Sequence, residues 1–175
     1  MRYVHQGATR VVGIDSSAFM VGEANEKIEI FGSGGIVKAL QIDADGDWLA
    51  FNDNSFDMVT STFALHYVEN LDPAWREIGR VVRHEGVLAF TVPHPLTGFR
   101  RKGDKNYEET TLLKVKLFDE AIEVFSYSHT FKDYLSQVFF SRFVVEDFTE
   151  FPDMAPRAGD LGVPGAFGVK ARRKE

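Results

Sequence analysis

Four short apolar runs divide the chain, and helical patterns lie between them. The runs cover residues 10–15, 36–43, 56–62 and 86–93. Near-continuous apolar runs of this length are typical of strands that are buried on both faces of a parallel sheet. The alternation of strand and helix indicates an α/β fold with right-handed crossovers. We therefore predict a Rossmann-like, doubly wound and mostly parallel sheet.

The first helix is predicted over residues 17–28, after a serine cap at Ser16 or Ser17. Its apolar face comprises Met20, Val21, Ala24 and Ile28. The glycine cluster that follows, "FGSGG" at 31–35, lies between a helix and a strand. A phosphate-cradling turn has the reverse order, with the strand first, so we interpret this cluster as a helix-ending loop.

The second helix is predicted over residues 72–84, where Asp72 can cap the amino end and Pro73 suits the first turn. Its apolar positions are Leu71, Trp75, Ile78 and Val82, which recur at helical spacing. We expect Gly86 to end this helix and to open the strand at 86–93.

The rhythm of strand and helix changes after residue 93. Residues 94–129 contain polar, turn-rich stretches, and we interpret them as an insertion that forms a lid over the carboxyl edge of the sheet, where ligands bind in such folds. An amphipathic helix is predicted over 130–142. The last segments, 143–151 and 165–173, are predicted to close the fold as an antiparallel hairpin.

Composition narrows the class of protein. At 175 residues the chain suits a single domain, 1–175, and without cysteine it has neither a disulfide framework nor thiolate chemistry. No run approaches the ~20 apolar residues of a membrane helix, so no membrane partner is expected. No signal peptide is visible, which makes a cytoplasmic location the expectation. The net charge of −6 argues against nucleic acid as the main partner.

Asp15 stands at the tip of the first predicted strand, in "RVVGIDSS". A carboxylate at that place can accept hydrogen bonds from both hydroxyls of a ribose. The competing interpretation is an N-cap for the helix that begins near Ser16. The acid alone does not identify the ligand, because nicotinamide-cofactor sites also use one at this place.

The order of several motifs resembles the class I S-adenosylmethionine-dependent methyltransferases, in the subgroup called methyltransferase type 11. The motifs are "VVGIDSS", Asp43-Ala44, Leu49-Ala50-Phe51, Asn54-Ser55-Phe56-Asp57 and "RVVRHEG" at 80–86. Further likenesses are "HP" at 94–95, "YSHTFKDYL" at 127–135 and "RFVVEDFTEFP" at 142–152. The resemblance covers roughly residues 7 to 173, and it departs from the family pattern at Ala50 and at His84-Glu85.

The resemblance implies S-adenosylmethionine as the cofactor and methyl transfer to a small-molecule acceptor. It places the cofactor against Asp15, Ser16, Asp43, Ala44, Ser61 and Thr62. Because the spacing before Leu49 differs from the family pattern, Asp45 competes with Asp43 for contact with the adenine. The acceptor pocket would form near His66, His94, Tyr127 and His129.

No residue is singled out as catalytic. Each histidine is expected to pack or to hold a hydrogen bond rather than to act as a base. No histidine pair has zinc spacing such as His-x-x-x-His, so no metal is expected.

The family's first strand and its glycine-rich turn, "Asp-Leu-Gly-Cys-Gly-Thr-Gly" or similar, have no counterpart before Asp15. We expect the gap to be closed by direct pairing of strands 10–15 and 56–62, by a strand from another chain, as in a homo-oligomer, or by a missing N-terminal segment. Without the turn, we expect weak or absent cofactor binding. The alternative functions are a non-catalytic, methyltransferase-like binding module and, with less support, an NAD-dependent oxidoreductase.

Overall fold

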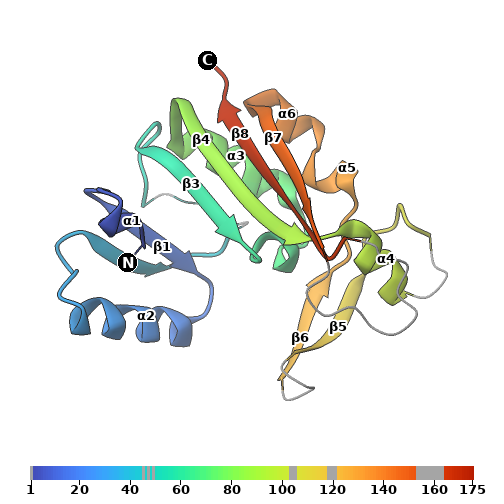
Figure 1. Ribbon diagram of the computed structural model, residues 1–175, viewed down its shortest axis with the longest axis horizontal. Coiled ribbons are helices and arrows are strands. Elements are labelled where there is room, and N and C mark those ends of the chain that lie inside the picture. Colours follow the sequence, from blue (N-terminus) through green and yellow to red (C-terminus); the bar gives the residue numbers. More distant parts are fainter. Residues whose placement is uncertain are drawn as a thin grey trace. The chain divides into compact units, whose positions relative to one another are not determined.

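The computed structural model describes residues 2–44, 46, 48, 50–102, 106–117, 122–152 and 164–175. The chain divides into two compact units, residues 1–48 and 49–175, which are described separately (Figure 1). In the part of the chain that is described, no helix has the length and apolar character needed to cross a membrane. Nor do the described side chains include a group of three His, Asp or Glu that could hold a metal ion.

The first unit contains one parallel strand pair and its crossover helix. Its elements are α1 (Arg2–His5), β1 (Val11–Asp15), α2 (Ala18–Ile30) and β2 (Val37–Gln41). The strands β1 and β2 pair in parallel, with Gly13 opposite Ala39. Ser17 caps α2 by accepting a hydrogen bond from the Met20 amide at 3.3 Å, which confirms the predicted serine cap.

The loop after α2 ends the helix as predicted from the glycine cluster. Phe31 is the C-cap, and Gly32 has a φ of +62°, the left-handed conformation that glycine adopts without steric cost. The predicted apolar face of α2 is only half-buried, however: Val21, Ala24 and Ile28 are of intermediate exposure and Met20 is 51% exposed. The helix therefore follows from local signals and not from a packed core.

The second unit is built on a four-stranded mixed sheet. Its strands are β3 (Phe56–Thr62), β4 (Val82–Pro93), β7 (Phe143–Phe151) and β8 (Ala166–Arg173), in the order β3-β4-β8-β7. β3 and β4 are parallel, whereas β8 is antiparallel to both of its neighbours. The predicted α/β class and the closing antiparallel hairpin are confirmed.

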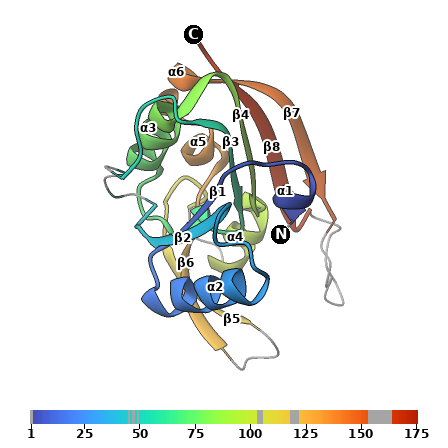
Figure 2. The ribbon, with the colours of Figure 1, turned by 90° about the vertical axis from the view of Figure 1, so that its left-hand side faces the viewer.

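Helices cover one face of this sheet, as Figures 1 and 2 show. They are α3 (Leu71–Val81), α5 (Phe131–Tyr134) and α6 (Gln137–Arg142), and the short 3-10 helix η1 (Leu65–Tyr67) precedes them. The ring of Trp75 on α3 lies 5.3 Å from Phe90 of β4 and 5.3 Å from Phe139 of α6. Phe167 of β8 joins the same cluster at 6.1 Å from Phe90, so aromatic rings form the core between sheet and helices.

The boundary between α3 and β4 differs from the prediction. Asn70, and not Asp72, caps α3, and the helix ends at Val81, from which β4 continues directly. Gly86 therefore lies inside the strand, where a Cβ would meet the Val82 Cγ1 at 2.7 Å. The residue before it, Glu85, has a φ of +60°, so the glycine marks a tight backbone bend within β4.

The single helix predicted over 130–142 is wrong, because the segment forms two short helices. Thr130 and Asp133 make a reciprocal capping box at the start of α5. Ser136 then caps α6 by accepting from the Phe139 amide at 3.3 Å. The Ser136 cap begins a new helix three residues after α5 ends. The two N-cap signals therefore determine the helix boundaries, although the apolar pattern is continuous across them.

The segment interpreted as an insertion forms a helix and a hairpin. α4 (Pro95–Lys102) follows β4, and β5 (Leu112–Leu117) pairs antiparallel with β6 (Ile122–Tyr127). Both follow the carboxyl end of β4, at Pro93 (Figure 1). This is the edge of the sheet at which open α/β folds bind ligands.

Candidate functional site

A cavity of about 320 Å³ lies in the second unit at the carboxyl ends of β3 and β4. We call it the ring cavity, because aromatic and imidazole rings dominate its lining. It is lined by Phe63, His66, Tyr67, Pro93, His94, Pro95, Thr97, Gly98, Leu113, Val115, Val124, Ser126, Tyr127, Ser128, His129, Tyr134 and Gly165. Its size falls at the small end of the range for small-molecule sites.

One face of the β5–β6 hairpin closes this cavity. The cross-strand pairs Leu113–Ser126 and Val115–Val124 share that face and line the cavity. Phe125 points to the other side and is 59% exposed. The alternation of side chains along the hairpin therefore separates a cavity face from an outer face.

Phe63 lies at the mouth of this site in a strained conformation. Its φ of +51° is in the left-handed region, which is rare for a bulky side chain and costs about 1–3 kcal/mol. A hydrogen bond from its amide to the Thr91 carbonyl, at 2.8 Å, holds the turn. The strain brings the Phe63 ring to 6.4 Å from His66. No residue in the local sequence signals this conformation.

His94 is almost fully buried, and both of its ring nitrogens are engaged. Nδ1 accepts a hydrogen bond from the Leu96 amide at 3.2 Å. Nε2 must then carry the proton, which it donates to the Glu150 carboxylate at 2.8 Å. The pair links the end of β4 to β7 and fixes the tautomer and the ring plane of His94.

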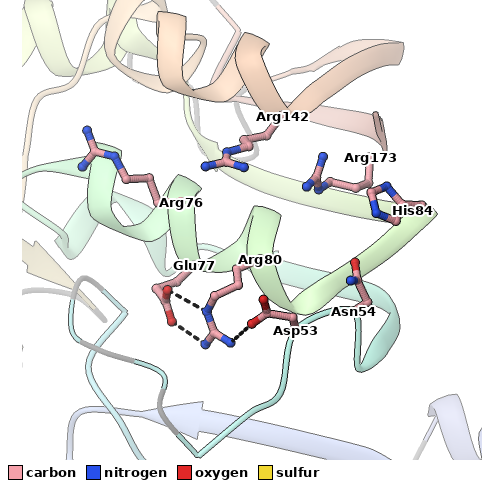
Figure 3. Close-up of a pocket in the computed structure, with 8 residues that line it drawn as sticks. All are labelled: Asp53, Asn54, Arg76, Glu77, Arg80, His84, Arg142 and Arg173. Atoms are coloured by element: carbon pink, nitrogen blue, oxygen red, sulfur yellow. Dashed lines mark hydrogen bonds and ion pairs between the residues drawn. The ribbon is translucent and has the colours of Figure 1, made fainter. Parts of the chain in front are cut away.

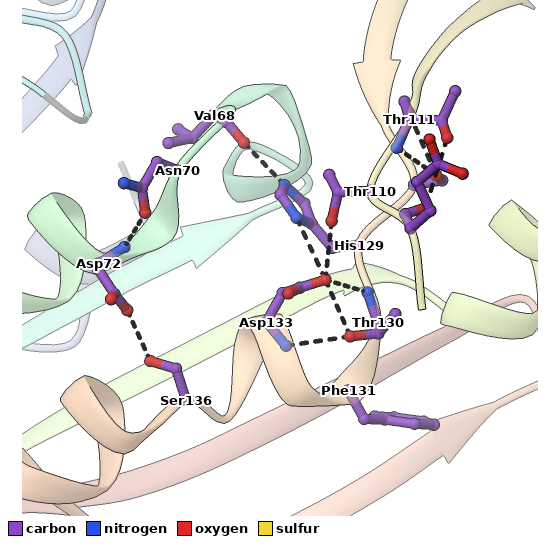
Figure 4. Close-up of polar contacts among 12 residues, drawn as sticks. Val68, Asn70, Asp72, Thr110, Thr111, His129, Thr130, Phe131, Asp133 and Ser136 are labelled. Carbon is purple, nitrogen blue, oxygen red and sulfur yellow. Dashed lines mark hydrogen bonds and ion pairs between the residues drawn. The ribbon is translucent and has the colours of Figure 1, made fainter. Parts of the chain in front are cut away.

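His129 is anchored through one ring nitrogen, Nε2, while its buried Nδ1 makes no hydrogen bond with the described residues (Figure 4). Its Nε2 donates to the Val68 carbonyl at 2.7 Å, and its Nδ1 lies 3.9 Å from Asp133 Oδ2. Burial lowers the pKa of His129 below its ordinary value of 6.5, although the Val68 hydrogen bond and the Asp133 charge oppose this. The imidazole is therefore neutral, and it ties the segment after η1 to the start of α5.

The third histidine of the cavity, His66, packs against Tyr67, with ring centroids 4.0 Å apart and ring planes tilted by 39°. Tyr127 lies 6.0 Å from His129. The structure thus brings together His66, His94, Tyr127 and His129, the four residues predicted for the acceptor pocket, around one cavity. Sequence reasoning missed their partners Glu150 and Val68, since both contacts join segments that are far apart in the chain.

Four of the residues predicted to contact the cofactor lie in the first unit: Asp15, Ser16, Asp43 and Ala44. Asp15 ends β1, is exposed, and accepts a hydrogen bond from the Ser17 amide through Oδ1 at 2.9 Å. Its Oδ2 makes no hydrogen bond with the described residues. The interpretation of Asp15 as the N-cap is wrong, because Ser17 holds that position. The competitor of Asp43, Asp45, lies outside the described residues, as does Leu49.

The other two predicted cofactor residues, Ser61 and Thr62, end β3 in the second unit. Thr62 is exposed. The Ser61 hydroxyl is buried and has no hydrogen-bond partner among the described residues. A buried hydroxyl without a partner costs free energy, so it is a candidate for contact with a bound polar group.

The sequence matches the methyltransferase domain family over residues 1–90, just over half of the chain. An uncharacterised protein of Haemophilus influenzae is 28% identical over 104 residues, which are 59% of this chain and 41% of that protein. The ubiquinone/menaquinone biosynthesis C-methyltransferase UbiE of Cellvibrio japonicus is 35% identical over 88 residues, 49% of this chain and 34% of that enzyme. The chain thus spans less than half the length of these curated relatives. The demethylmenaquinone methyltransferase of Lactobacillus johnsonii is 26% identical over 94% of this chain and 66% of that enzyme.

Two solved structures are similar in fold. A putative S-adenosylmethionine-dependent methyltransferase from Listeria monocytogenes has a TM-score of 0.76 and 22% identity over 99% of this chain and 84% of its own. An S-adenosylmethionine-dependent methyltransferase from Mesorhizobium loti has a TM-score of 0.74 and 24% identity over 98% of this chain and 84% of its own. These likenesses confirm the fold class. With the sequence match over residues 1–90, they confirm the resemblance drawn from the motifs: the chain belongs to the methyltransferase domain family.

Proposed function

We propose that the chain takes part in the transfer of a methyl group from S-adenosylmethionine to an uncharged small molecule held in the ring cavity. The lining of that cavity carries the proposal. No Asp, Glu, Lys or Arg is among the described residues that line it, and most are aromatic or aliphatic. A charged acceptor would lose its hydration there without gaining an opposite charge, whereas a neutral ring would pack on Phe63, Tyr67 and Tyr127.

The named relatives support an acceptor of this kind. The Lactobacillus johnsonii relative is named for demethylmenaquinone, an uncharged ring compound, and the Cellvibrio japonicus relative for ubiquinone and menaquinone biosynthesis. Their names also support a methyl donor as the cofactor, and the Listeria monocytogenes structure is described as S-adenosylmethionine-dependent.

The polar atoms of the predicted cofactor residues suit parts of S-adenosylmethionine. The exposed Asp15 carboxylate has one uncommitted oxygen, which would accept from a ribose hydroxyl. The buried Ser61 hydroxyl would gain the hydrogen bond that it lacks in the described residues. Asp43 is exposed beside Ala44, and its carboxylate would accept from an adenine amino group.

When bound, S-adenosylmethionine supplies a methyl group that is already activated as a sulfonium. The protein's own contribution is then to hold the acceptor in line and to exclude water. The His94–Glu150 and His129–Val68 contacts fix two walls of the cavity, and the β5–β6 hairpin covers a third. His94 has both ring nitrogens engaged by protein groups and His129 is anchored through Nε2, so both rings would orient the acceptor.

Calorimetric titration of the full chain with S-adenosylmethionine, S-adenosylhomocysteine and NAD tests the donor. Asp15→Ala should weaken binding of S-adenosylhomocysteine by roughly 1.5–3 kcal/mol, the range for a hydrogen bond to a charged group. Ser17→Ala is the matched control, since it removes the cap of α2 but keeps the carboxylate. Because the glycine-rich turn has no counterpart before Asp15, weak binding is expected; a preference for NAD, or equal losses in the two variants, would contradict the proposal.

Ligand-detected nuclear magnetic resonance tests the acceptor class. Hydroquinone should bind, and 2,5-dihydroxybenzoate, which adds one carboxylate to the same ring, should not. Val115→Asp places a charge on the cavity face of β5 and should abolish hydroquinone binding. Leu112→Asp makes the same change at a position that is 51% exposed and does not line the cavity, and it should leave binding intact. Preference for the carboxylate would refute the uncharged acceptor.

A further inference from the structure

A second depression, of about 290 Å³, lies in the second unit at the amino end of β4. We call it the arginine depression. It is lined by Asp53, Asn54, Arg76, Glu77, Arg80, His84, Arg142 and Arg173, and it shares no lining residue with the ring cavity (Figure 3). β4 runs from His84 beside this depression to Pro93 beside the ring cavity, so the two hollows flank opposite ends of one strand.

Both acids of the depression are already committed to one arginine. Arg80 makes two hydrogen bonds to the Glu77 carboxylate, at 2.9 and 2.7 Å, and another to Asp53 Oδ1 at 2.7 Å. These contacts raise the Arg80 pKa above its ordinary value. Figure 3 shows the three side chains joined in one chain of ion pairs. Glu77 and Asp53 are therefore both engaged with the Arg80 guanidinium.

The other three arginines have no acidic partner among the described residues. Within the described residues, the Arg173 guanidinium donates to two backbone carbonyls, to Gly79 at 2.6 Å and to Lys174 at 2.9 Å. Arg76 and Arg142 make no side-chain hydrogen bond or ion pair with the described part of the chain. Figure 3 shows Arg76, Arg142 and Arg173 apart from the ion-pair chain. With four arginines and two acids, the depression carries a formal surplus of two positive charges in a chain of net charge −6.

The packing of α3 keeps these cations together. Gly79 lies in the last turn of α3, where glycine still favours the helix less than alanine does. A Cβ there would meet Arg142 Cγ at 2.9 Å, so the glycine leaves room for the Arg142 stem to cross the helix. Burial, with the Arg142 charge as a second cause, lowers the pKa of Arg173. The packing thus holds the Arg142 and Arg173 charges close together. This arrangement lowers helix stability at Gly79, and it keeps two guanidinium groups that repel each other side by side.

We propose that the arginine depression binds a small molecule through a phosphate or diphosphate group. A guanidinium presents a planar fork of N–H donors that matches phosphate oxygens, and an anion would offset the repulsion between Arg142 and Arg173. The volume suits a phosphorylated small molecule, and the net charge of −6 opposes a nucleic-acid backbone. This site is independent of the proposed methyl transfer, because neither the acceptor nor the donor residues line it.

Calorimetric titration of the full chain with phosphate, pyrophosphate and citrate tests this site, at an ionic strength held constant with sodium chloride. Pyrophosphate should bind more tightly than citrate. Arg142→Gln and Arg76→Gln should each weaken pyrophosphate binding about tenfold, equivalent to ~1.4 kcal/mol. Arg83→Gln is the matched control. Arg83 carries the same charge close by, pairs with Asp57 at 2.7 Å and does not line the depression, so its loss should change the affinity less than twofold.

Three results would overturn the proposal: no binding of pyrophosphate, tighter binding of citrate, or equal losses in all three variants. The last result would indicate general attraction to positive charge and not a site. Arg76 is exposed, so its variant keeps the test valid if Arg142→Gln, which alters packing on Gly79, does not fold.

Discussion

The two compact units of the chain differ in how far they bury their apolar side chains. In residues 1–48, Phe19 is 74% exposed and Ile30 is 70% exposed, and no residue of α2 is fully covered. In residues 49–175, Trp75, Phe139 and Phe167 are completely buried in one aromatic cluster. Both units nevertheless contain regular strands and helices with well-formed caps.

The difference shows that local sequence signals can specify helices and strands even where no apolar core is packed against them. The first unit depends on the Ser17 cap, on β1–β2 pairing and on Asn25, whose side-chain amide bonds both backbone groups of Ala39. Neither a 13-residue helix nor a two-stranded sheet is more than marginally stable alone in water. The second unit adds a buried core, so we expect it to hold most of the free energy of unfolding.

Replacing Trp75 with alanine should break the core of the second unit. The loss of a buried aromatic side chain costs about 3–5 kcal/mol, because the transfer free energy is lost and a cavity is left between α3, β4 and α6. Phe19→Ala is the comparison in the first unit and should change stability by less than about 0.5 kcal/mol. Denaturant unfolding with hydrogen exchange measures both, and similar losses would show that α2 is packed after all.

Two helical glycines should respond to alanine with opposite sign. Gly22→Ala in α2 should stabilise the chain by about 0.5–1 kcal/mol, since a Cβ there meets nothing within 4 Å and alanine favours helix. Gly79→Ala in α3 should destabilise it by about 1–3 kcal/mol, because the Cβ would overlap the Arg142 stem. Urea unfolding of the two variants measures the sign of each change in the free energy of unfolding. A gain in Gly79→Ala would mean that Arg142 moves away freely.

The buried His129 should make the second unit sensitive to mild acid. Burial lowers its pKa in the folded chain, so below pH ~6.5 the unfolded chain binds a proton that the folded chain does not. Stability should therefore fall as the pH drops from above 6.5 toward the folded pKa. His129→Gln, which keeps a donor for the Val68 carbonyl, should show a smaller fall between pH 7.5 and 5.5 in denaturant titrations. An unchanged pH slope would assign the effect to other groups.

Most elements could be predicted from the sequence, because their signals are local. The apolar runs at 10–15 and 56–62 mark β1 and β3 within a residue, and the glycine cluster after α2 marks the end of that helix. The break between α5 and α6 was also encoded, in Thr130 with Asp133 and in the cap at Ser136, but the apolar periodicity of 130–142 hid it.

The candidate sites were only partly predictable. The four residues His66, His94, Tyr127 and His129 follow from family motifs in sequence order, and the structure places them around one cavity. The strained Phe63 and the arginine depression could not be predicted. The depression needs α6 and the end of β8 beside α3, and β8 reaches that place only by entering the sheet between β4 and β7. The proximity of these elements depends on the strand order of the sheet, which no local sequence pattern predicts.

A further pair of small effects is predicted at two residues with left-handed backbone, one in each unit. Glu85 has a φ of +60°, in the left-handed region that favours glycine, so Glu85→Gly should stabilise the chain by about 1 kcal/mol. Gly32 has a φ of +62° with open space around it, so Gly32→Ala should destabilise the chain by about 1 kcal/mol through backbone strain alone. Glu85→Gln keeps the strain and removes only the charge, which separates the two causes. Thermal unfolding of the three variants measures these changes in stability. If Gly32→Ala is neutral while Glu85→Gly stabilises, the loop after α2 relaxes without loss, and the first unit is held even more loosely than its exposed side chains indicate.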